Sequence, residues 1–348
     1  MAVPTTTRRY VLTELGSYKN LTLQEAPVPK LKANDVLVKI HAVSLQYRDL
    51  MIAGGKYPIA KRPPNLVPCS DSAGEVVAIG EEVQNWKVGD RVCANFATGH
   101  LYGPTNPAIQ STSLGGQAQG VLTEYRAFPS ESLVAIPQYL SYEEASTLPC
   151  AALTAYNALN GPVPVKAGDS VLVLGTGGVS TFGLQFAVAS GATVIATSSS
   201  DEKLKVFSKL GAKHVINYNK TPDWEQEVLK FTNGEGVNHV IEVGGGTISK
   251  SVTSARFGSG QIHVIGFVAQ GSGEPNFVLS LIRSAVTFRG IQIGSVAQFK
   301  DMIRLMEANP EVTKPLVNKV FPFDQAIDAY VYLESQKHVG KVVIKVAA

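Results

Sequence analysis

The stretch that decides the fold is VLVLGTGGVSTFG, Val171 to Gly183. Its apolar opening predicts a buried strand, and the residues after it predict a helix that ends at Gly191. Gly175, Gly177 and Gly178 lie where the two elements join. Glycine there permits a tight turn and lets backbone N–H groups approach a pyrophosphate at the positive end of the helix. The stretch therefore predicts a dinucleotide-binding fold.

The pattern continues after this stretch with strands and helices in alternation. A second strand ends at Ser198, and a helix follows that Ser200 caps and Gly211 ends. Further strand-like runs are HVINY (214–218), HVIEVGG (239–245), QIHVIGF (261–267) and TFRGI (287–291). Alternation of this kind predicts a parallel sheet with helices on both faces. AVTFRGIQI (285–293) is expected to be its edge strand.

The first third of the chain has a different pattern, with short strands and turns. Strands are predicted at 35–43, 73–80, 86–94 and 121–129. Strands this short and closely spaced predict an antiparallel, barrel-like domain. The Gly-, Pro-, Thr- and Ser-rich segment 95–120 is expected to be a loop that could cover a substrate. After 294 the sequence predicts two helices, at 296–308 and 323–335, and a closing strand at 340–346.

The composition bounds the class of protein. A chain of 348 residues, 45% hydrophobic and 17% charged, is typical of a soluble α/β protein of about two domains. The net charge of +3, without basic runs, argues against nucleic-acid partners. No signal-peptide core and no apolar run of about 20 residues is found, so we expect a cytoplasmic protein without membrane contact. The three cysteines do not form a disulfide framework.

The choice of coenzyme depends on the serine run 198–200. Dinucleotide folds that bind NAD(H) carry an acidic residue near the end of the second strand, where it accepts from the adenosine 2′-hydroxyl. Ser198 occupies that place here, so nothing repels a 2′-phosphate. Ser198 and Ser199 offer hydroxyls, and Lys203 and Tyr218 are positioned to help. We therefore predict NADP(H) rather than NAD(H).

Other features of this run leave room for another interpretation. Asp201 and Glu202 count against a phosphate, although carboxylates suit the first turn of a helix. Ser200 can be a helix cap and nothing more, and Lys203 can be a solvated surface lysine.

By its motifs the chain resembles the medium-chain dehydrogenase/reductase superfamily, in its zinc-free, quinone oxidoreductase-like branch. The landmarks, in the family's order, are SLQYRDL, PCSDSAGEVVAIG, WKVGDRV, GVLTEYR, TLPCAALTAYNAL, VLVLGTGGVS, SSSDEKL, LGAKHVINY and GKVVIKV. The resemblance implies an α/β protein in three parts: a GroES-like β-barrel catalytic domain (1–153), a Rossmann domain with a doubly wound parallel sheet that binds NADP(H) (154–292), and a C-terminal segment that completes the catalytic domain (293–348).

The resemblance also shows where this chain departs from its zinc-dependent relatives. Their Cys, His and Cys ligands match Gln46, Ser70 and Cys150 here. An amide and a neutral hydroxyl are poor zinc donors, so we predict no metal. The segment 95–120 lacks the four cysteines of a structural zinc lobe. Asp71, next to one of these positions, is interpreted as a structural carboxylate.

Without a metal, an alcohol lacks the Lewis acid that would stabilise its alkoxide, whereas an electrophilic substrate needs less help. The predicted reaction is NADPH-dependent hydride transfer to an activated C=C or C=O bond of an enone, quinone or reactive carbonyl. Gln46, Tyr47 and Arg48 match the place where family substrates bind, and Tyr47 is the first candidate for donating a proton or hydrogen bond. An internal ion pair between Arg48 and Asp49 is the alternative for that arginine.

The resemblance implies further coenzyme contacts. Thr154 matches a position beside the nicotinamide, and Gly266, Phe267 and Val268 match the backbone that holds its carboxamide. Gly244 ends a strand at the same sheet edge. Thr176 and Val179 complete the phosphate loop. Two residues are left out of the site: His100, expected to be an exposed loop residue, and Lys341, expected to be a surface lysine at the start of a strand.

Two other functions stay open. One is an alcohol dehydrogenase with an atypical metal site built on Cys150 and Asp71. The other is a non-catalytic protein that binds NADPH as a structural or sensing ligand. The expected partners are a small electrophilic substrate and further copies of the chain, in a homodimer or homotetramer.

Overall fold

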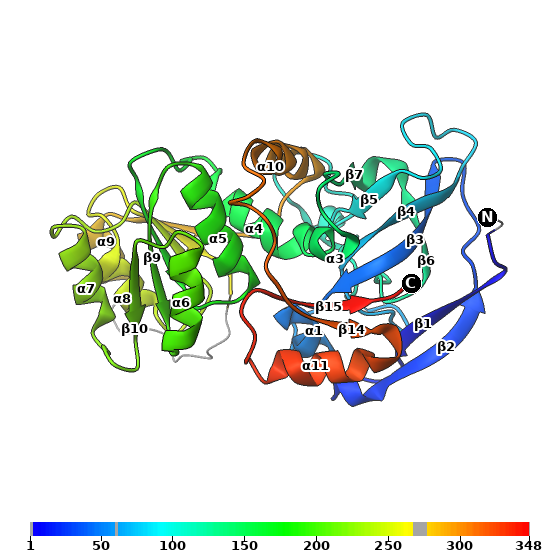
Figure 1. Ribbon diagram of the computed structural model, residues 1–348, viewed down its shortest axis with the longest axis horizontal. Coiled ribbons are helices and arrows are strands. Elements are labelled where there is room, and N and C mark those ends of the chain that lie inside the picture. The colour runs from blue at the N-terminus through cyan, green and yellow to red at the C-terminus, as the bar shows by residue number, and fades with distance from the viewer. Residues whose placement is uncertain (1–2, 60–61, 267–276, 348) are drawn as a thin grey trace. The chain divides into compact units, whose positions relative to one another are not determined.

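The computed structural model describes residues 3–59, 62–266 and 277–347. Phe267 and Val268, predicted to contact the coenzyme, lie outside the described residues. The chain divides into two compact units: the first holds residues 1–153, 293–307 and 315–348, and the second holds 154–292 and 308–314 (Figure 1). The C-terminal segment thus returns to the first unit, apart from 308–314.

The first unit is built on a seven-stranded sheet in the order β14-β15-β3-β4-β5-β7, in which β6 also pairs with β3. Its strands are β3 (Asp35–Ser44), β4 (Asp71–Ile79), β5 (Arg91–Ala94), β6 (Tyr125–Pro129), β7 (Leu133–Ala135), β14 (Val317–Pro322) and β15 (Lys341–Lys345). Strand β15 pairs antiparallel with β3, so Ile344 lies opposite Val43. The barrel-like domain expected from the sequence is confirmed.

Two strand predictions in this unit are too long. Strand β5 begins only at Arg91, because residues 87–90 form a turn in which Asp90 Oδ2 accepts from Lys87 N at 3.0 Å and Gly89 has φ +95°. Strand β6 begins at Tyr125 rather than Val121. The segment 95–120 is more than a loop, because it contains the helical turn α2 (Pro107–Gln110).

The described residues of the first unit also form eight helical elements besides α2. They are η1 (Tyr18–Asn20), α1 (Tyr47–Ala53), η2 (Ser130–Ser132), α3 (Tyr142–Ala145), η3 (Leu148–Ala152), α10 (Val296–Ala308), η4 (Phe323–Gln325) and α11 (Ala326–Glu334). Helix α11 buries Ala326, Ala329, Tyr330 and Leu333, the spacing of one helix face.

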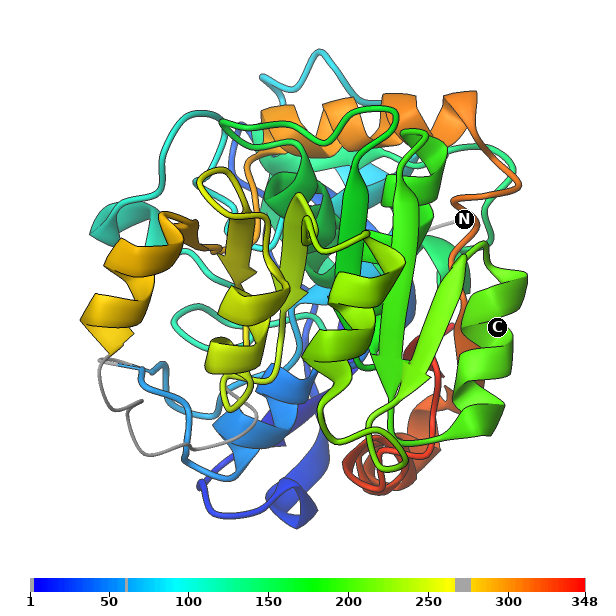
Figure 2. The ribbon, with the colours of Figure 1, turned by 90° about the vertical axis from the view of Figure 1, so that its left-hand side faces the viewer.

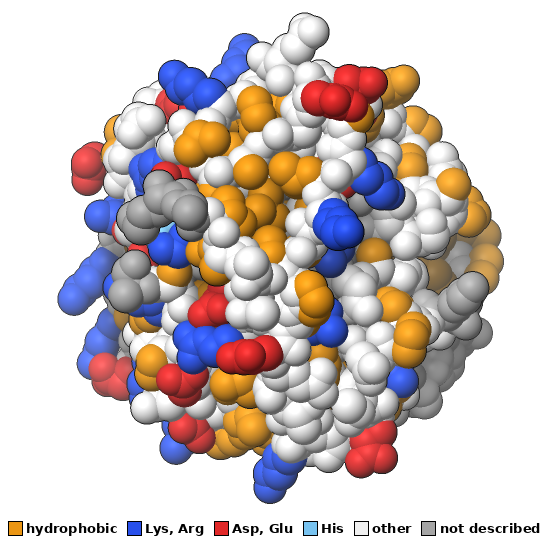
Figure 3. Space-filling view, turned by 90° about the vertical axis from the view of Figure 1, so that its right-hand side faces the viewer, with side chains coloured by type: hydrophobic (Ala, Val, Ile, Leu, Met, Phe, Trp, Pro, Cys, Tyr) orange, Lys and Arg blue, Asp and Glu red, His pale blue; other side chains and the backbone are white. Residues whose placement is uncertain are grey.

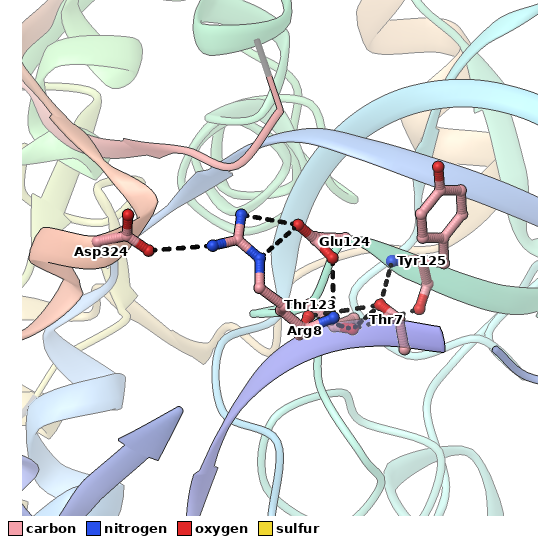
Figure 4. Close-up of polar contacts among 6 residues, drawn as sticks. All are labelled: Thr7, Arg8, Thr123, Glu124, Tyr125 and Asp324. Atoms are coloured by element: carbon pink, nitrogen blue, oxygen red, sulfur yellow. Dashed lines mark hydrogen bonds and ion pairs between the residues drawn. The ribbon is translucent and has the colours of Figure 1, made fainter. Parts of the chain in front are cut away.

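A polar network fastens the N-terminal strand pair, β1 (Thr6–Leu12) with β2 (Leu21–Pro27), to this unit. Arg8 donates from Nε to Glu124 at 2.9 Å and from Nη1 to Asp324 at 3.3 Å, while Thr7 Oγ1 lies 3.3 Å from Thr123 Oγ1 (Figure 4). These contacts join segments that are far apart in the sequence. On the surface, Figure 3 shows basic and acidic side chains interspersed on one face.

The second unit is a six-stranded parallel sheet in the order β10-β9-β8-β11-β12-β13, with helices on both faces (Figure 2). Its strands are β8 (Ser170–Leu174), β9 (Thr193–Ser198), β10 (His214–Asn217), β11 (His239–Glu242), β12 (Gln261–Val264) and β13 (Thr287–Gly290). Its helices are α4 (Leu153–Leu159), α5 (Gly178–Ala189), α6 (Asp201–Lys209), α7 (Trp224–Phe231), α8 (Ile248–Ser254) and α9 (Phe277–Ser284).

This order is that of a doubly wound sheet, in which the chain changes direction between β8 and β11. Ligands of such sheets bind outside the carboxyl ends of the strands at this switch point. The predicted α/β class, the parallel sheet and β13 as its edge strand are confirmed. In the described ranges, no helix is long and apolar enough to cross a membrane.

Candidate functional site

Asp71, the first residue of β4, is the centre of a buried polar cluster in the first unit. Its carboxylate accepts from Gln46 Nε2 at 2.6 Å, from Ser70 Oγ at 2.5 Å and from the backbone N of Cys150 at 2.9 Å. Gln46 precedes helix α1, and Cys150 lies in the π-helical turn η3. Burial raises the pKa of Asp71 to about 6 despite these donors. One carboxylate therefore holds together three segments of the chain.

Lys341, at the start of β15, is buried, so the expectation of a surface lysine is wrong. Its Nζ donates to the carbonyl oxygen of Leu45 at 2.5 Å. Burial lowers its pKa, an effect that the negative charge of Asp71 opposes. Lys341 is buried because β15 lies inside the sheet, between β14 and β3. The residues next to Lys341 in the sequence do not reveal this position.

Asp49 is a second buried carboxylate at the start of α1. Its Oδ2 accepts from the backbone N of Gln46 at 2.7 Å, whereas its Oδ1 has no hydrogen-bond partner among the described residues. Burial raises the pKa of Asp49 to about 6, and the nearby charge of Asp71 adds to the rise. Two buried acids and one buried lysine thus share the interior of this unit.

Arg48 does not form the ion pair with Asp49 that was the alternative expectation, as far as the described residues show. Its guanidinium lies over the rings of Tyr57 and Phe96, at 5.2 and 4.8 Å from their centroids, and Nη1 donates to Leu114 O at 3.0 Å. The guanidinium is therefore held by two aromatic rings and a carbonyl oxygen, and not by the carboxylate of Asp49. Its Nε and Nη2 are buried and lack partners in the described part of the chain.

Two other residues of this unit bear on the predictions. Tyr47 begins α1 and is 39% exposed. His100 was expected to be exposed, and this is wrong. It is buried, with Nε2 at 2.9 Å from Gly103 O, because the segment 95–120 folds back on itself.

The predicted phosphate loop joins β8 to α5 in the second unit. Gly175 has φ +73°, which favours glycine, and Gly177 is the extended residue that precedes α5. A Cβ added at either glycine would meet nothing within 4 Å. The loop backbone is therefore open to a pyrophosphate, and the residues present fit that group. Thr176, Gly178 and Val179 complete the turn, with Thr176 buried.

The serine run lies at the carboxyl end of β9. Ser198 is buried, and its Oγ accepts from Ser200 N at 3.3 Å. Ser200 caps α6 by accepting from Lys203 N, as predicted. Ser199 is exposed, Tyr218 is 39% exposed, and its backbone N donates to Ser198 O at 3.0 Å. Lys203 is half-buried, and burial lowers its pKa.

The end of β11 holds a carboxylate whose role the sequence did not reveal. Glu242 is fully buried and accepts from Gly244 N at 2.8 Å, Gly245 N at 3.1 Å, Thr247 Oγ1 at 2.9 Å and Ser251 Oγ at 2.5 Å. The run of small and hydroxylated residues after Glu242 was the available signal. Because the N–H of Gly244 is bound to Glu242, it is not free to donate to a coenzyme.

The remaining predicted contacts lie in the second unit. Thr154 is buried, and its Oγ1 has no hydrogen-bond partner among the described residues. At Gly266 a Cβ would lie 2.3 Å from Val243 O, so the close approach of two backbones requires glycine there.

These features define a class of protein. A doubly wound sheet with an open glycine turn at its switch point is a dinucleotide-binding domain, and the barrel-like unit carries a buried cluster of titratable groups. The combination is that of a two-domain oxidoreductase.

Comparison with known proteins identifies the family. Residues 32–138 match the family model described as the alcohol dehydrogenase GroES-like domain, and residues 178–308 match that of the zinc-binding dehydrogenases. The chain belongs to the medium-chain dehydrogenase/reductase superfamily. It is therefore an oxidoreductase whose second unit is the nicotinamide-dinucleotide domain of that family.

Three relatives illustrate the range of the similarity. A "zinc-type alcohol dehydrogenase-like protein" of Schizosaccharomyces pombe is 47% identical, over 97% of this chain and 99% of its own length. The 2-methylene-furan-3-one reductase of Solanum lycopersicum is 32% identical, over 99% of this chain and 80% of its own. A solved structure from Sinorhizobium meliloti, provisionally described as an alcohol dehydrogenase, has a TM-score of 0.90 at 37% identity, over 99% and 100%.

The zinc in the names of this family does not fit the residues found here. Gln46 and Ser70 offer a metal only an amide oxygen and a neutral hydroxyl, and the thiol of Cys150 is buried, which raises its pKa and keeps it protonated. Zinc prefers thiolate and imidazole. Among the described residues, no group of three or more His, Cys, Asp or Glu side chains could hold a metal ion.

Proposed function

We propose that this protein is a zinc-independent, NADPH-dependent reductase of activated C=C or C=O bonds. One observation carries the proposal: at the metal-ligand positions of zinc-dependent relatives, Gln46, Ser70 and Cys150 offer an amide oxygen, a neutral hydroxyl and a buried, protonated thiol. Zinc prefers thiolate and imidazole to these groups, while Asp71 fixes the position of the three residues through hydrogen bonds.

The coenzyme half of the proposal rests on the second unit. The open backbone at Gly175 and Gly177 would hold the pyrophosphate, and Ser198 and Ser199 would donate to a 2′-phosphate. When bound, NADPH supplies the hydride. Ser198 in place of a carboxylate removes a repulsion of about 4 kcal/mol per charge pair at roughly 4 Å and an effective dielectric near 20. This difference favours NADPH over NADH.

The substrate class follows from what the first unit can stabilise. A reduction that places negative charge on an oxygen needs hydrogen-bond donors at that oxygen. Tyr47 is partly exposed, and Arg48 has two N–H-bearing nitrogens without partners among the described residues, so we assign these two residues as donors. Gln46 is a positioning residue, because its amide is engaged by Asp71. Substrates that are already electrophilic require no more than this.

The comparisons supply independent support for a C=C substrate. The tomato relative is named for a ketone conjugated to a methylene group, which is an activated C=C bond. The atypical metal site built on Cys150 and Asp71 has less support, because the thiol is protonated and the carboxylate already accepts three hydrogen bonds.

A turnover panel tests the proposal. We expect NADPH consumption with enones, quinones or reactive aldehydes, a higher kcat/KM for NADPH than for NADH, and no oxidation of simple alcohols with NADP⁺. Equal use of the two coenzymes would contradict the coenzyme assignment. Tight NADPH binding without turnover of any member of the panel would favour the non-catalytic alternative.

A further inference from the structure

We infer that Lys220 is a coenzyme-specificity residue that binds the 2′-phosphate of NADPH while Asp201 holds it in place. The inference rests on the proposed function and adds to it a residue that lies outside the serine run. The sequence gives little sign of it, because Lys220 follows a strand other than the one that ends in the serines.

The position of Lys220 is set by a turn after β10. Its Nζ donates to Asp201 Oδ2 at 2.5 Å, and Asn217 Nδ2 donates to Asp201 Oδ1 at 2.7 Å. Asp201 is the first residue of α6, so the pair brings a cation to the start of the helix that follows the serine run. The turn itself is closed by Lys220 N, which donates to Asn217 O at 3.0 Å.

Three contacts tie this turn to the serines. Asn217 lies opposite Ser198 in the parallel pairing of β10 with β9. The backbone N of Tyr218 donates to Ser198 O at 3.0 Å. Asn219 Nδ2 donates to Ser199 O at 3.2 Å. Lys220 therefore follows directly on residues that contact Ser198 and Ser199, which are the proposed phosphate donors.

The charges around the start of α6 also favour the binding of an anion. Asp201 and Glu202 are the two carboxylates that would repel a phosphate, and each is paired with a lysine: Lys220 with Asp201, and Lys205 with Glu202 at 2.6 Å. An ammonium group has three N–H donors. Lys220 can therefore keep its bond to Asp201 and still donate to a phosphate oxygen. Its side chain is 68% exposed, which leaves the ammonium group accessible.

The test compares two lysines in matched settings. Lys205 is 67% exposed and paired with a carboxylate of α6, as Lys220 is, but it belongs to α6 itself. Binding of 2′,5′-ADP, 5′-ADP, NADPH and NADH is measured by calorimetry for the wild-type protein, Lys220→Met, Lys220→Arg and Lys205→Met. Neither lysine is buried, so the variants should fold, and thermal unfolding verifies this.

We expect Lys220→Met to weaken binding of 2′,5′-ADP and NADPH by roughly five- to tenfold, as for one charge-assisted hydrogen bond at an exposed site. Binding of 5′-ADP and NADH should change less than about twofold, Lys220→Arg should retain most of the affinity, and Lys205→Met should resemble the wild type. Equal effects of Lys220→Met and Lys205→Met would overturn the role of Lys220. A wild-type protein that binds 5′-ADP as tightly as 2′,5′-ADP would instead overturn the NADPH assignment, and the role of Lys220 with it.

Discussion

Ser198 is the buried residue on which the proposed preference for NADPH over NADH depends. It ends β9 and is paired in register with Asn217, so its side chain is fixed where the strand meets α6. Local features of this kind were predictable from the sequence, as were the Ser200 cap and the turn at Gly175. They depend on neighbours in the chain, which the sequence displays directly.

Replacing Ser198 with Asp should reverse the coenzyme preference. A carboxylate there repels the 2′-phosphate and can accept from a 2′-hydroxyl, so kcat/KM with NADPH should fall at least about tenfold while that with NADH is kept or rises. Steady-state kinetics with both coenzymes measures this. Ser208→Asp, on the exposed end of α6, carries the same charge change and should alter neither value. A Ser198→Asp variant that still prefers NADPH would refute the role of Ser198.

Lys341 and Arg48 show where prediction from the sequence failed at this scale. The burial of Lys341 depends on β14 and β3, and the stacking of Arg48 depends on Phe96 and Tyr57. These partners are distant in the sequence or indistinguishable there from ordinary packing. No local pattern could have revealed either contact.

At the scale of elements, β11 and β12 carry a buried histidine pair that no predicted function uses. His239 Nδ1 lies 3.1 Å from His263 Nε2, and His239 Nε2 lies 3.7 Å from Asp169 Oδ2. Burial lowers the pKa of both histidines, that of His263 to about 3, to which the charges of His239 and Arg289 contribute. Both rings are therefore neutral in the folded protein at neutral pH.

This pair should contribute a loss of stability in acid, which Asp49 and Asp71 oppose because their raised pKa values favour the folded state as the pH falls from about 6 to 4. The pKa of an unfolded histidine is about 6.5, so its lower value in the folded state gives stability that is complete above pH 6.5 and is lost as the pH falls toward 3. The loss for His263 should approach about 1.4 kcal/mol of unfolding free energy per pH unit in that window.

Denaturant unfolding between pH 7.5 and 4.5 measures the effect. His263→Gln, which cannot titrate, should be less stable than the wild type at pH 7.5, because the site is buried, and this difference in unfolding free energy should shrink as the pH falls. For His214→Gln, at a half-buried histidine, the difference from the wild type should change much less with pH. The same slope in His263→Gln and in the wild type would contradict the assignment.

Element types were more predictable than element ends. Strand and helix alternation identified the parallel sheet, because hydrophobic period and glycine ends are local signals. The start of β5 at Arg91 and the helical turn Pro107–Gln110 were missed, since a turn held by Asp90 and a folded segment 95–120 depend on contacts outside any strand pattern.

At the scale of the whole molecule, each unit contributes one half of the proposed chemistry. The second unit offers the open glycine turn and the serine run 198–200, and the residues of both were identified from the sequence. The first unit offers a buried polar cluster, of which the sequence identified the members Gln46, Ser70, Asp71 and Cys150 but not their arrangement. Only the structure shows that the carboxylate of Asp71 binds the other three residues.

The metal content of the active enzyme tests the central claim most directly. Purified protein is analysed for transition metals, and its kcat/KM with NADPH and an enone is measured before and after dialysis against a chelator. We expect far less than one transition-metal ion per chain and unchanged activity, because Gln46, Ser70 and the protonated Cys150 are poor ligands for such an ion. One tightly held ion per chain, whose removal abolishes activity and whose return restores it, would contradict the claim.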